Sequence, residues 1–410
     1  MNFPGTTTIL KGFENPMKHA KRILTGSVAL VLAAAIWLPC LHLFFSRPAS
    51  AFYAKEGLSP KARELGARQM QIWTDPQLRE KELDRMRASN AEWDFMARSY
   101  LVWALANMGL RDPSSKPVCL QTMDRIIDET LHLEHEKGMY FFLMPYAKAR
   151  PYLVQPARSL FLDGEIALML ASRRVLEDKP EYKAALTERV NLMVNGLRHN
   201  PHMALESYPD ECWTFDHVVA LTAIRMSDYL DGSDHTILIR DWVAMARKKL
   251  VHPESGLLVS SYETDGTPMI GPEGSSLWMV AYCLQLVDED FARDQYERAR
   301  HELGGSALGF SYAREWPDSW KGPADIDSGP IIPVLDISTG SSGMAFIGAT
   351  AFGDDAFLAS LNAMLDFAGF PSRKNGALKY CASNQVGDAV LFYAATLGPV
   401  WQKVKEGRKL

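Results

Sequence analysis

The chain has 410 residues, of which 47% are hydrophobic and 23% are charged, and its formal net charge is −5. This is ordinary globular composition, with enough apolar side chains to form a large core. Phosphate binding needs a concentrated basic face, and no long basic run follows the N-terminal segment. The composition therefore argues against nucleic acid as a partner.

The sequence carries none of the patterns that hold a metal ion or a cofactor. Its five cysteines are spread along the chain without a C-x-x-C pair, which argues against a zinc site and a disulfide framework. Asp325 and Asp327 form a D-x-D pair that lacks the remaining ligands of a calcium loop. Without an H-E-x-x-H motif or a glycine-rich phosphate loop, we expect neither metal nor cofactor.

The N-terminal segment is typical of a membrane anchor. Residues 23–45 contain no formally charged side chain and are long enough to cross a hydrocarbon core of about 30 Å. Lys11, Lys18, Lys21 and Arg22 precede this stretch, and such a bias keeps the N-terminus in the cytoplasm. We expect a cytoplasmic tail over residues 1–22 and a signal anchor over 23–45 in a bacterial-type inner membrane. The rest of the chain then lies in the periplasm or outside the cell.

A cleaved signal peptide is the alternative interpretation. Ala49-Ser50-Ala51 has the A-x-A form of a cleavage site. The apolar stretch and the segment before it are both longer than is usual in a signal peptide, which favours a retained anchor. Both interpretations export the remaining chain.

Helical periodicity dominates the chain from about Ser59 onward, and we expect a linker and leading helices over residues 46–90 before a helical domain over 91–410. The exception is Leu257–Tyr262, where alternation predicts a small hairpin. The expected helices are Ala91–Met108, Gln121–His135, Ser159–Leu176, Glu181–Leu197, Phe215–Leu230, Ile237–Leu250, Ser275–Val287, Asp290–Leu303, Thr339–Ala351, Asp355–Ala368 and Gly387–Val404.

These helices come in pairs joined by loops rich in Gly, Pro and Asp, and the pairs repeat about every 45–60 residues. Such an array either remains an open solenoid or closes on itself. Several first helices open with small residues, including Gly164, Ser275 and Gly343, which permit close approach of inner helices or act only as N-terminal caps. First helices that begin with acidic and polar groups favour a closed ring with a funnel at those ends.

Five segments carry a pattern of a known family: Leu162–Met169, Ser207–Leu221, His252–Gly256, Leu258–Tyr262 and Ser341–Phe346. Together they resemble the linalool dehydratase/isomerase-like family. The resemblance covers roughly residues 90–405, and it implies an all-α (α/α)6 toroid, here with an N-terminal transmembrane helix, that acts on a C–O bond of an alcohol. The same architecture also hosts glycoside hydrolases and polysaccharide lyases.

One departure from the family bears on chemistry. The positions of the family's two cysteines correspond to Ser207 and Asp216, and its histidine on the earlier inner helix corresponds to Glu165. Cys212 lies between Ser207 and Asp216 and matches neither cysteine. The resemblance therefore implies the location of a site in which carboxylates replace softer groups, and it argues against cysteine-dependent terpenol dehydration.

Glu165, Asp216, Asp210 and Glu211 are the candidate catalytic residues. Glu165 precedes an apolar run, which predicts an inner helix, and the other three acids belong to the densest polar group of the chain. A carboxyl in apolar surroundings has a raised pKa and can donate a proton, while a second carboxylate acts as base or nucleophile. The structural alternatives are a helix-starting acid at Glu165, an N-cap at Asp216 and a turn at Asp210.

Other polar and aromatic side chains are candidates for substrate binding. Flat aromatic faces suit a sugar ring or a prenyl chain, and they lower the local dielectric around nearby acids. Some of these acids stand at helix starts, where they need have no further role. The candidate binding residues are Asp163, Tyr208, Trp213, His217, Tyr262, Trp316 and Asp388.

Three functions remain open from the sequence. An enzyme acting on an alcohol predicts a narrow, mostly apolar pocket around Glu165 and Asp216. A glycoside hydrolase or related carbohydrate-active enzyme predicts a wide, aromatic-lined cleft with two carboxyl groups about 5–10 Å apart. A noncatalytic envelope protein that binds glycans or proteins would keep its function without these carboxyls. The gathering of acids and aromatics at helix starts favours an enzyme acting on a small molecule or glycan.

Overall fold

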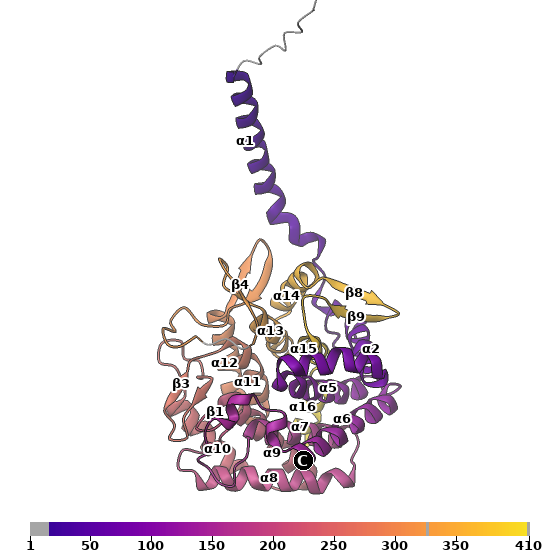
Figure 1. Ribbon diagram of the computed structural model, residues 1–410, viewed down its shortest axis with the longest axis vertical. Helices are drawn as coiled ribbons and strands as arrows, with labels where there is room; N and C mark the ends of the chain where they lie inside the picture. The colour runs from indigo at the N-terminus through magenta and orange to yellow at the C-terminus, as the bar shows by residue number, and fades with distance from the viewer. Residues whose placement is uncertain (1–15, 325–327, 408–410) are drawn as a thin grey trace, which may run out of the picture.

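The computed structural model of this protein describes residues 16–324 and 328–407. Most of the tail expected over residues 1–22 lies outside the described residues, as do Asp325 and Asp327. Figure 1 shows a rounded helical body from which one long helix projects.

The projecting helix, α1 (Pro16–Cys40), continues into short 3-10 turns η1 (Leu41–Phe44) and η2 (Ala49–Ala51). Within the stretch Met17–Phe44, the most apolar 18-residue window has a mean hydropathy of 2.1, and none of that window is buried. At about 1.5 Å per residue, this length exceeds a hydrocarbon core of about 30 Å. Length and composition therefore fit a membrane span, and they fit a signal sequence equally well.

The body is built around a closed ring of parallel helices. Among the described residues, six helices pack each against the next, and the last packs against the first. Figure 1 looks along the axis of this ring. The predicted (α/α)6 toroid is thereby confirmed. The inner ring consists of α5 (Ala91–Arg111), α7 (Leu160–Leu176), α9 (Thr214–Asp231), α11 (Gly274–Val287), α13 (Thr339–Phe352) and α15 (Gln385–Thr396).

Outer helices follow the inner ones in chain order. They are α6 (Lys116–Lys137), α8 (Pro180–His199), α10 (Thr236–Lys249), α12 (Glu289–Glu302) and α14 (Asp355–Ala368). The place outside α15 is taken by α2 (Pro60–Thr74), which comes from the other end of the sequence. The helical domain predicted over residues 91–410 does not include α2, because nothing local in the sequence shows that α2 packs on α15.

Hydrogen bonds fix the two ends of the chain together where the ring closes. The buried Lys61 Nζ of α2 donates to Asn362 Oδ1 at 2.5 Å and pairs with Asp366 Oδ1 at 2.7 Å, both on α14. At the end of α5, Arg111 Nε donates to the carbonyl of Thr396 at 2.8 Å. Its Nη1 reaches the carbonyl of Ala54, also at 2.8 Å.

Short segments connect the helix pairs. Before α5 the chain forms α3 (Pro76–Arg79), η3 (Glu80–Asp84) and α4 (Arg85–Ser89), and after α6 it forms η4 (Met139–Phe141) and η5 (Pro145–Lys148). The hairpin predicted around Leu257–Tyr262 forms slightly later in the sequence. It consists of β2 (Ser261–Tyr262) and β3 (Pro268–Ile270), and β1 (Cys212–Trp213) pairs with β2.

Two further antiparallel sheets were not expected from the sequence. One has the order β4-β5-β7-β6 and contains β4 (Gly304–Ala307), β5 (Phe310–Ala313), β6 (Ile331–Ile332) and β7 (Ile337–Ser338). The other pairs β8 (Pro371–Lys374) with β9 (Ala377–Tyr380). These strands are two to four residues long, which is too short for a recognisable alternation.

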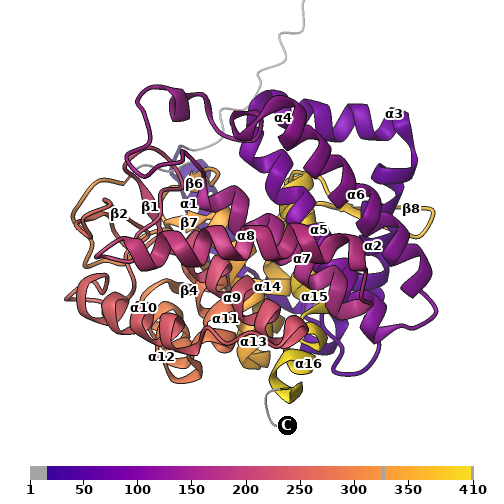
Figure 2. The ribbon, with the colours of Figure 1, turned by 90° about the horizontal axis from the view of Figure 1, so that it is seen from below.

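One end of the inner ring is covered by α16 (Pro399–Gly407), which packs on α5, α7, α9 and α11. The predicted helix Gly387–Val404 is wrong here, because it breaks between α15 and α16. Gly398 has a φ of 115°, which a helix cannot continue through, and Pro399 starts the next helix. Figure 2 shows α16 at one end of the body and the connecting loops at the other.

Aromatic rings fill the middle of the inner ring. Tyr100 packs edge-on against Trp103 at 4.9 Å between ring centroids and lies 5.7 Å from Tyr393. Tyr282 stacks on Trp401 of α16 at 4.6 Å. All five side chains are buried. The ring is thus a packed core, and its remaining end, where the inner helices begin, is called the mouth below.

At Gly164, α7 comes close to the backbone of α9. A β-carbon on Gly164 would lie 3.3 Å from the backbone nitrogen of Ala220. We therefore expect Gly164→Val to push these helices apart and lower the free energy of unfolding by about 1–3 kcal/mol. Thermal denaturation of the full chain measures this loss.

Gly343 on α13 is the matched control, because no heavy atom lies within 4 Å of a β-carbon built there. We expect Gly343→Val to change stability by no more than about 0.5 kcal/mol. Equal losses at both positions would show that close approach at Gly164 is not what restricts this position.

Candidate active site

Three acidic side chains stand in the early turns of neighbouring inner helices. Glu92 lies on α5, Glu165 on α7 and Asp216 on α9. Their charges act on one another, since Glu92 and Asp216 raise the pKa of Glu165 and Glu92 raises that of Asp216. Parallel packing of the inner helices is what brings these early turns to the mouth together.

Glu165 is completely buried, and neither carboxyl oxygen has a well-formed hydrogen bond within the described residues. Burial raises the pKa of Glu165 well above its usual range, and the nearby Asp216 carboxylate adds to the effect. The Ser99 hydroxyl on α5 opposes the shift. Burial and the nearby charge therefore favour the protonated form of Glu165.

Asp216 is 5% exposed and lies in the first turn of α9. Burial raises its pKa to about 8, the Ser207 hydroxyl opposes the shift, and the charges of Glu92 and Glu211 add to it. Asp216 is not the N-cap of α9, because Trp213 occupies that position. The structural alternative of a capping role is therefore wrong. Glu165 and Asp216 are called the acid pair below.

The inner face beneath the acid pair carries Tyr100 and Cys283, which the sequence did not single out as site residues. Burial raises the pKa of the Tyr100 phenol well above its usual range, and Glu165, Cys283 and Asp216 add to the effect. Burial also raises the pKa of the Cys283 thiol, with a contribution from Glu165. Both groups are therefore neutral, and they surround the acids with weakly polar surface.

Aromatic side chains and a second layer of acids line the loop before α9. Trp213 is half-buried, and its Nε1 donates to Glu211 Oε1 at 2.7 Å. Tyr208 is buried, stacks on Tyr146 at 4.4 Å and donates its hydroxyl to Glu92. Tyr208 therefore holds the rim of the mouth, while Trp213 keeps an accessible surface.

Asp210 and His217 stabilise the same loop. Asp210 has a φ of 53°, and its Oδ1 accepts from the Thr264 hydroxyl at 3.0 Å. His217 donates from Nδ1 to the Trp213 carbonyl at 2.7 Å and accepts at Nε2 from the Leu205 amide at 2.9 Å. Burial lowers the pKa of His217 to about 4, so the ring stays neutral. Both of its nitrogens are occupied by backbone groups, as expected for a positioning role.

Tyr262 on β2 belongs to the packing around His217. Its ring lies 5.4 Å from the His217 ring and is completely buried. The buried Glu206 is a loop anchor that the sequence did not reveal. Its carboxylate accepts from the backbone amides of Leu153 at 3.0 Å, Val154 at 2.6 Å and Asp210 at 2.5 Å.

Trp316 lies at the mouth, near the start of α11. The neighbouring Glu315 accepts from the amide and hydroxyl of Ser275 at 2.9 and 2.5 Å, and from the Ser338 hydroxyl before α13. Trp316 is half-buried and stacks on Trp320 at 6.3 Å. Glu315 thus fixes the Trp316 loop to two inner helices.

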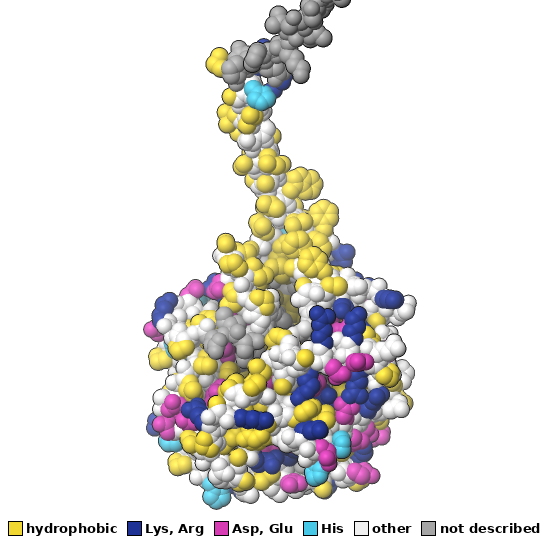
Figure 3. Space-filling model, in the orientation of Figure 1, with side chains coloured by type: hydrophobic (Ala, Val, Ile, Leu, Met, Phe, Trp, Pro, Cys, Tyr) yellow, Lys and Arg dark blue, Asp and Glu magenta, His cyan; other side chains and the backbone are white. Residues whose placement is uncertain are grey.

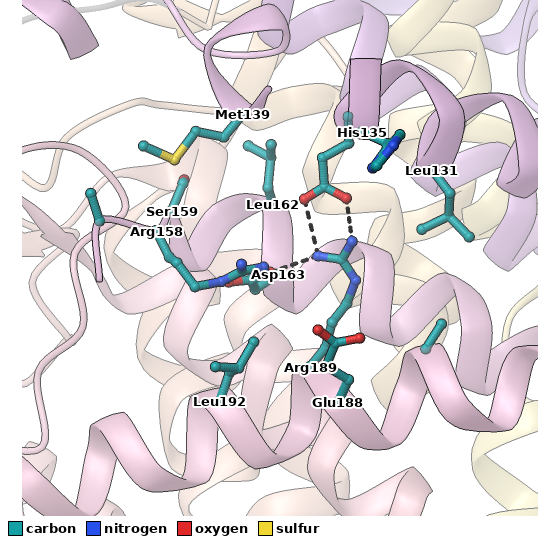
Figure 4. A pocket seen from close by; sticks show the side chains of 13 residues that line it. Leu131, His135, Met139, Arg158, Ser159, Leu162, Asp163, Glu188, Arg189 and Leu192 are labelled. Carbon is teal, nitrogen blue, oxygen red and sulfur yellow. Dashed lines mark hydrogen bonds and ion pairs between the residues drawn. The ribbon is translucent and has the colours of Figure 1, made fainter. Parts of the chain in front are cut away.

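Asp163 lies apart from the acid pair, although only Gly164 separates it from Glu165 in the sequence. Its carboxylate accepts from Arg158 Nε and Arg189 Nη1, both at 2.6 Å, and Arg189 also pairs with Glu134. These groups line a pocket of about 530 Å³ between α6 and α8, on the outer side of α7 (Figure 4). Asp163 is thus part of an ion-pair network outside the inner ring.

Asp388 on α15 also lies apart from the acid pair. Its Oδ2 accepts from the Tyr380 amide of β9 at 3.4 Å, and the charges of Lys379 and Arg68 act on it. Burial raises its pKa to about 7. Asp388 therefore belongs to the packing between α15, β9 and α2.

Over the ranges 16–324 and 328–407, no group of three or more His, Cys, Asp or Glu side chains is arranged to hold a metal ion. What the mouth offers chemically is a pair of protonatable carboxyls, with neutral phenol, thiol and indole groups around it.

No protein-family model and no curated protein sequence matches this chain. Among solved structures, the GH76 α-mannanase of Bacteroides thetaiotaomicron is similar with a TM-score of 0.47 and 10% identity, over 76% of this chain and 87% of that one. The GH76A α-1,6-mannanase of Salegentibacter sp. gives 0.46 and 14%, over 75% and 89%. A family 105 glycoside hydrolase of C. acetobutylicum gives 0.44 and 10%, over 83% and 99%.

The raised pKa of Asp216 predicts how stability depends on pH. Between about pH 4, where an unfolded aspartate titrates, and pH 8, the folded chain binds more protons at Asp216 than the unfolded chain does. The free energy of unfolding therefore falls as pH rises through this window, by up to about 1.4 kcal/mol per pH unit for this group. We expect Asp216→Asn to melt at a higher temperature than the parent at pH 8, with little difference near pH 4.

Asp241→Asn, at an exposed carboxyl on α10, is the control, and its melting temperature should equal that of the parent at every pH. Calorimetry or circular dichroism across the pH range measures both variants. If Asp216→Asn follows the parent too, Asp216 does not carry the extra proton in the folded state.

Proposed function

We propose that this chain is an enzyme that uses the acid pair for general acid–base chemistry at the C–O bond of a small, largely apolar alcohol. The observation that carries the proposal is the complete burial of Glu165 next to the nearly buried Asp216, with both pKa values raised. A carboxylic acid kept protonated at neutral pH can deliver a proton to a departing oxygen.

The two acids differ in a way that assigns their roles. Glu165 has no well-formed hydrogen bond within the described residues, and its pKa is raised by the charge on Asp216. Asp216 retains some exposure, and the Ser207 hydroxyl favours its ionised form. Asp216 therefore ionises first and becomes the base, while Glu165 keeps its proton and acts as the acid.

The proposed reaction balances with these two groups alone. The C–O bond breaks, its electron pair stays on oxygen, and the proton of Glu165 completes a leaving water molecule. Asp216 takes a proton from the neighbouring carbon, and the electrons of that C–H bond form the carbon–carbon double bond. A proton passing from Asp216 back to Glu165, directly or through water, restores the starting state.

The surroundings of the acid pair favour a small substrate. Tyr100 and Cys283 are fully buried beneath the acids. The acid pair lines neither the outer pocket of about 530 Å³ nor a second one of about 480 Å³ between α4 and the loop after α6. Weakly polar surroundings fit an alcohol with a hydrocarbon body, in line with the linalool dehydratase/isomerase-like pattern of the sequence.

A carbohydrate-active enzyme is the second candidate. Trp213 and Trp316 both keep accessible surface near the mouth, and sugar rings stack on such faces. Sugar cleavage also requires a proton donor and a second carboxylate. A screen of the purified chain against alcohols and against glycans separates the two. Turnover of a glycan would favour the carbohydrate reaction, and turnover of an alcohol would favour the C–O lyase reaction.

We also propose that α1 is a retained anchor in a bacterial-type inner membrane, with residues 1–22 in the cytoplasm and the ring on the far side. Lys18, Lys21 and Arg22 lie near the start of the helix, as expected for its cytoplasmic end. Phe45, just beyond the helix, packs on Phe367 of α14 at 5.3 Å. Cleavage after Ala51 would remove this contact, which supports retention.

Substitution of the acid pair tests the proposed chemistry. We expect Asp216→Asn and Glu165→Gln each to lower turnover of the screened substrate by at least about 100-fold, since each removes one proton-transfer group. Circular dichroism of the detergent-solubilised full chain should show an unchanged fold. Turnover that survives in either variant would remove that residue from its catalytic role.

Asp163→Asn is the matched control on the same helix, because its carboxylate faces the outer pocket. We expect this variant to keep its turnover at temperatures where it remains folded, even though two arginines lose an ion-pair partner. A loss as large as that of Glu165→Gln would place the reaction outside the inner ring.

A further inference from the structure

The edge of the ring nearest to α1 carries exposed apolar side chains from segments far apart in the sequence. Leu308, in the β4–β5 turn, is 50% exposed. Phe367 of α14 is 40% exposed, and Phe370, just before β8, is 66% exposed. Leu43 and Phe44, at the end of the anchor, are 60% and 65% exposed. These five residues are called the anchor-side patch.

Direct contacts join the segments of the patch to the end of the anchor. Phe45 lies 5.3 Å from Phe367 and 6.4 Å from Phe310, and these two rings stack on each other at 5.0 Å. Gly309 lies against the His42 ring so closely that a β-carbon there would be 2.3 Å from Nδ1. The Ser360 hydroxyl of α14 donates to the Gly309 carbonyl at 3.0 Å. The patch is therefore continuous with the apolar surface of α1.

The figures show the same arrangement. In Figure 1 the β4–β5 hairpin, α14 and the β8–β9 hairpin lie along the edge of the ring from which α1 leaves. In Figure 3 hydrophobic side chains run down α1 and continue onto the top of the body. The backbone is strained at two residues of the patch, because Leu308 and Phe370 have φ values of 51° and 50°.

Basic side chains accompany the patch. Arg47 is exposed two residues after Phe45, and Lys374 is exposed at the end of β8, four residues after Phe370. A protein surface that lies on a bilayer typically combines two features. Its apolar side chains enter the boundary of the hydrocarbon, and its cations meet the anionic headgroups.

We propose that the anchor-side patch rests on the outer leaflet of the membrane that α1 spans. The proposal depends on α1 being a retained anchor. Leu308, Phe367 and Phe370 then enter the interface between headgroups and acyl chains, with Arg47 and Lys374 at headgroup level. Since α1 lies across the ring axis in Figure 1, the mouth opens sideways along the membrane surface, where apolar alcohols concentrate.

Site-directed spin labelling of the full chain tests this contact. The accessible Cys40 and Cys381 are first replaced by serine, while the buried Cys119, Cys212 and Cys283 are kept. Single cysteines then replace Leu308 or Phe370 and receive a nitroxide label. The chain is reconstituted in phosphatidylcholine vesicles with a minority of phosphatidylglycerol.

Collision of the label with oxygen, which dissolves in lipid, is compared with collision with a water-soluble nickel chelate. The matched control is a label in place of Ile237, which is 67% exposed on α10 at the far side of the ring. We expect an oxygen-to-nickel ratio severalfold higher at positions 308 and 370 than at 237. Equal ratios at all three positions in membrane-bound chain would overturn the proposal.

Alkaline carbonate extraction of the same vesicles separates this inference from the anchor itself. A chain that stays in the membrane while both labels remain exposed to water contradicts only the contact of the patch. Release of the chain by carbonate contradicts the retained anchor, and the contact falls with it.

Discussion

Parallel packing of the inner helices is the constraint on which the rest of this structure depends. Because every inner helix runs in the same direction, all of their first turns reach one end of the ring. Residues that are about 50 to 70 positions apart in sequence thereby become neighbours, as Glu92, Glu165 and Asp216 do. The close approach at Gly164 brings α7 and α9 near enough for the acid pair to interact.

Two effects act on these carboxyls in opposite directions. The N-terminal end of a helix favours a negative charge by about 0.3–1 kcal/mol. Removing a carboxylate from water costs several kcal/mol unless hydrogen bonds compensate. Glu165 lacks a well-formed hydrogen bond among the described residues, so burial prevails and the acid form is favoured. Asp163, on the same helix, has two arginine partners that satisfy its charge.

The sequence predicted the helices well because their apolar stripes are long and periodic. It also placed Glu165 and Asp163 on different faces of one helix, which follows from helical geometry. It did not reveal α2 as the missing outer helix, because that assignment depends on packing between the two ends of the chain. Glu92 and Glu206 were missed for a similar reason, since their partners Tyr208 and Leu153 lie on other segments.

Distance along the chain also explains which candidate residues the fold brings together. Trp213, Glu211 and Asp216 are close in sequence and stay close in space, so local reasoning sufficed for them. Asp388 also begins an inner helix, yet its side chain turns toward β9, because a first-turn residue can point to either side of the ring. A position at the start of an inner helix therefore brings a side chain to the mouth only when that side chain also points into the ring.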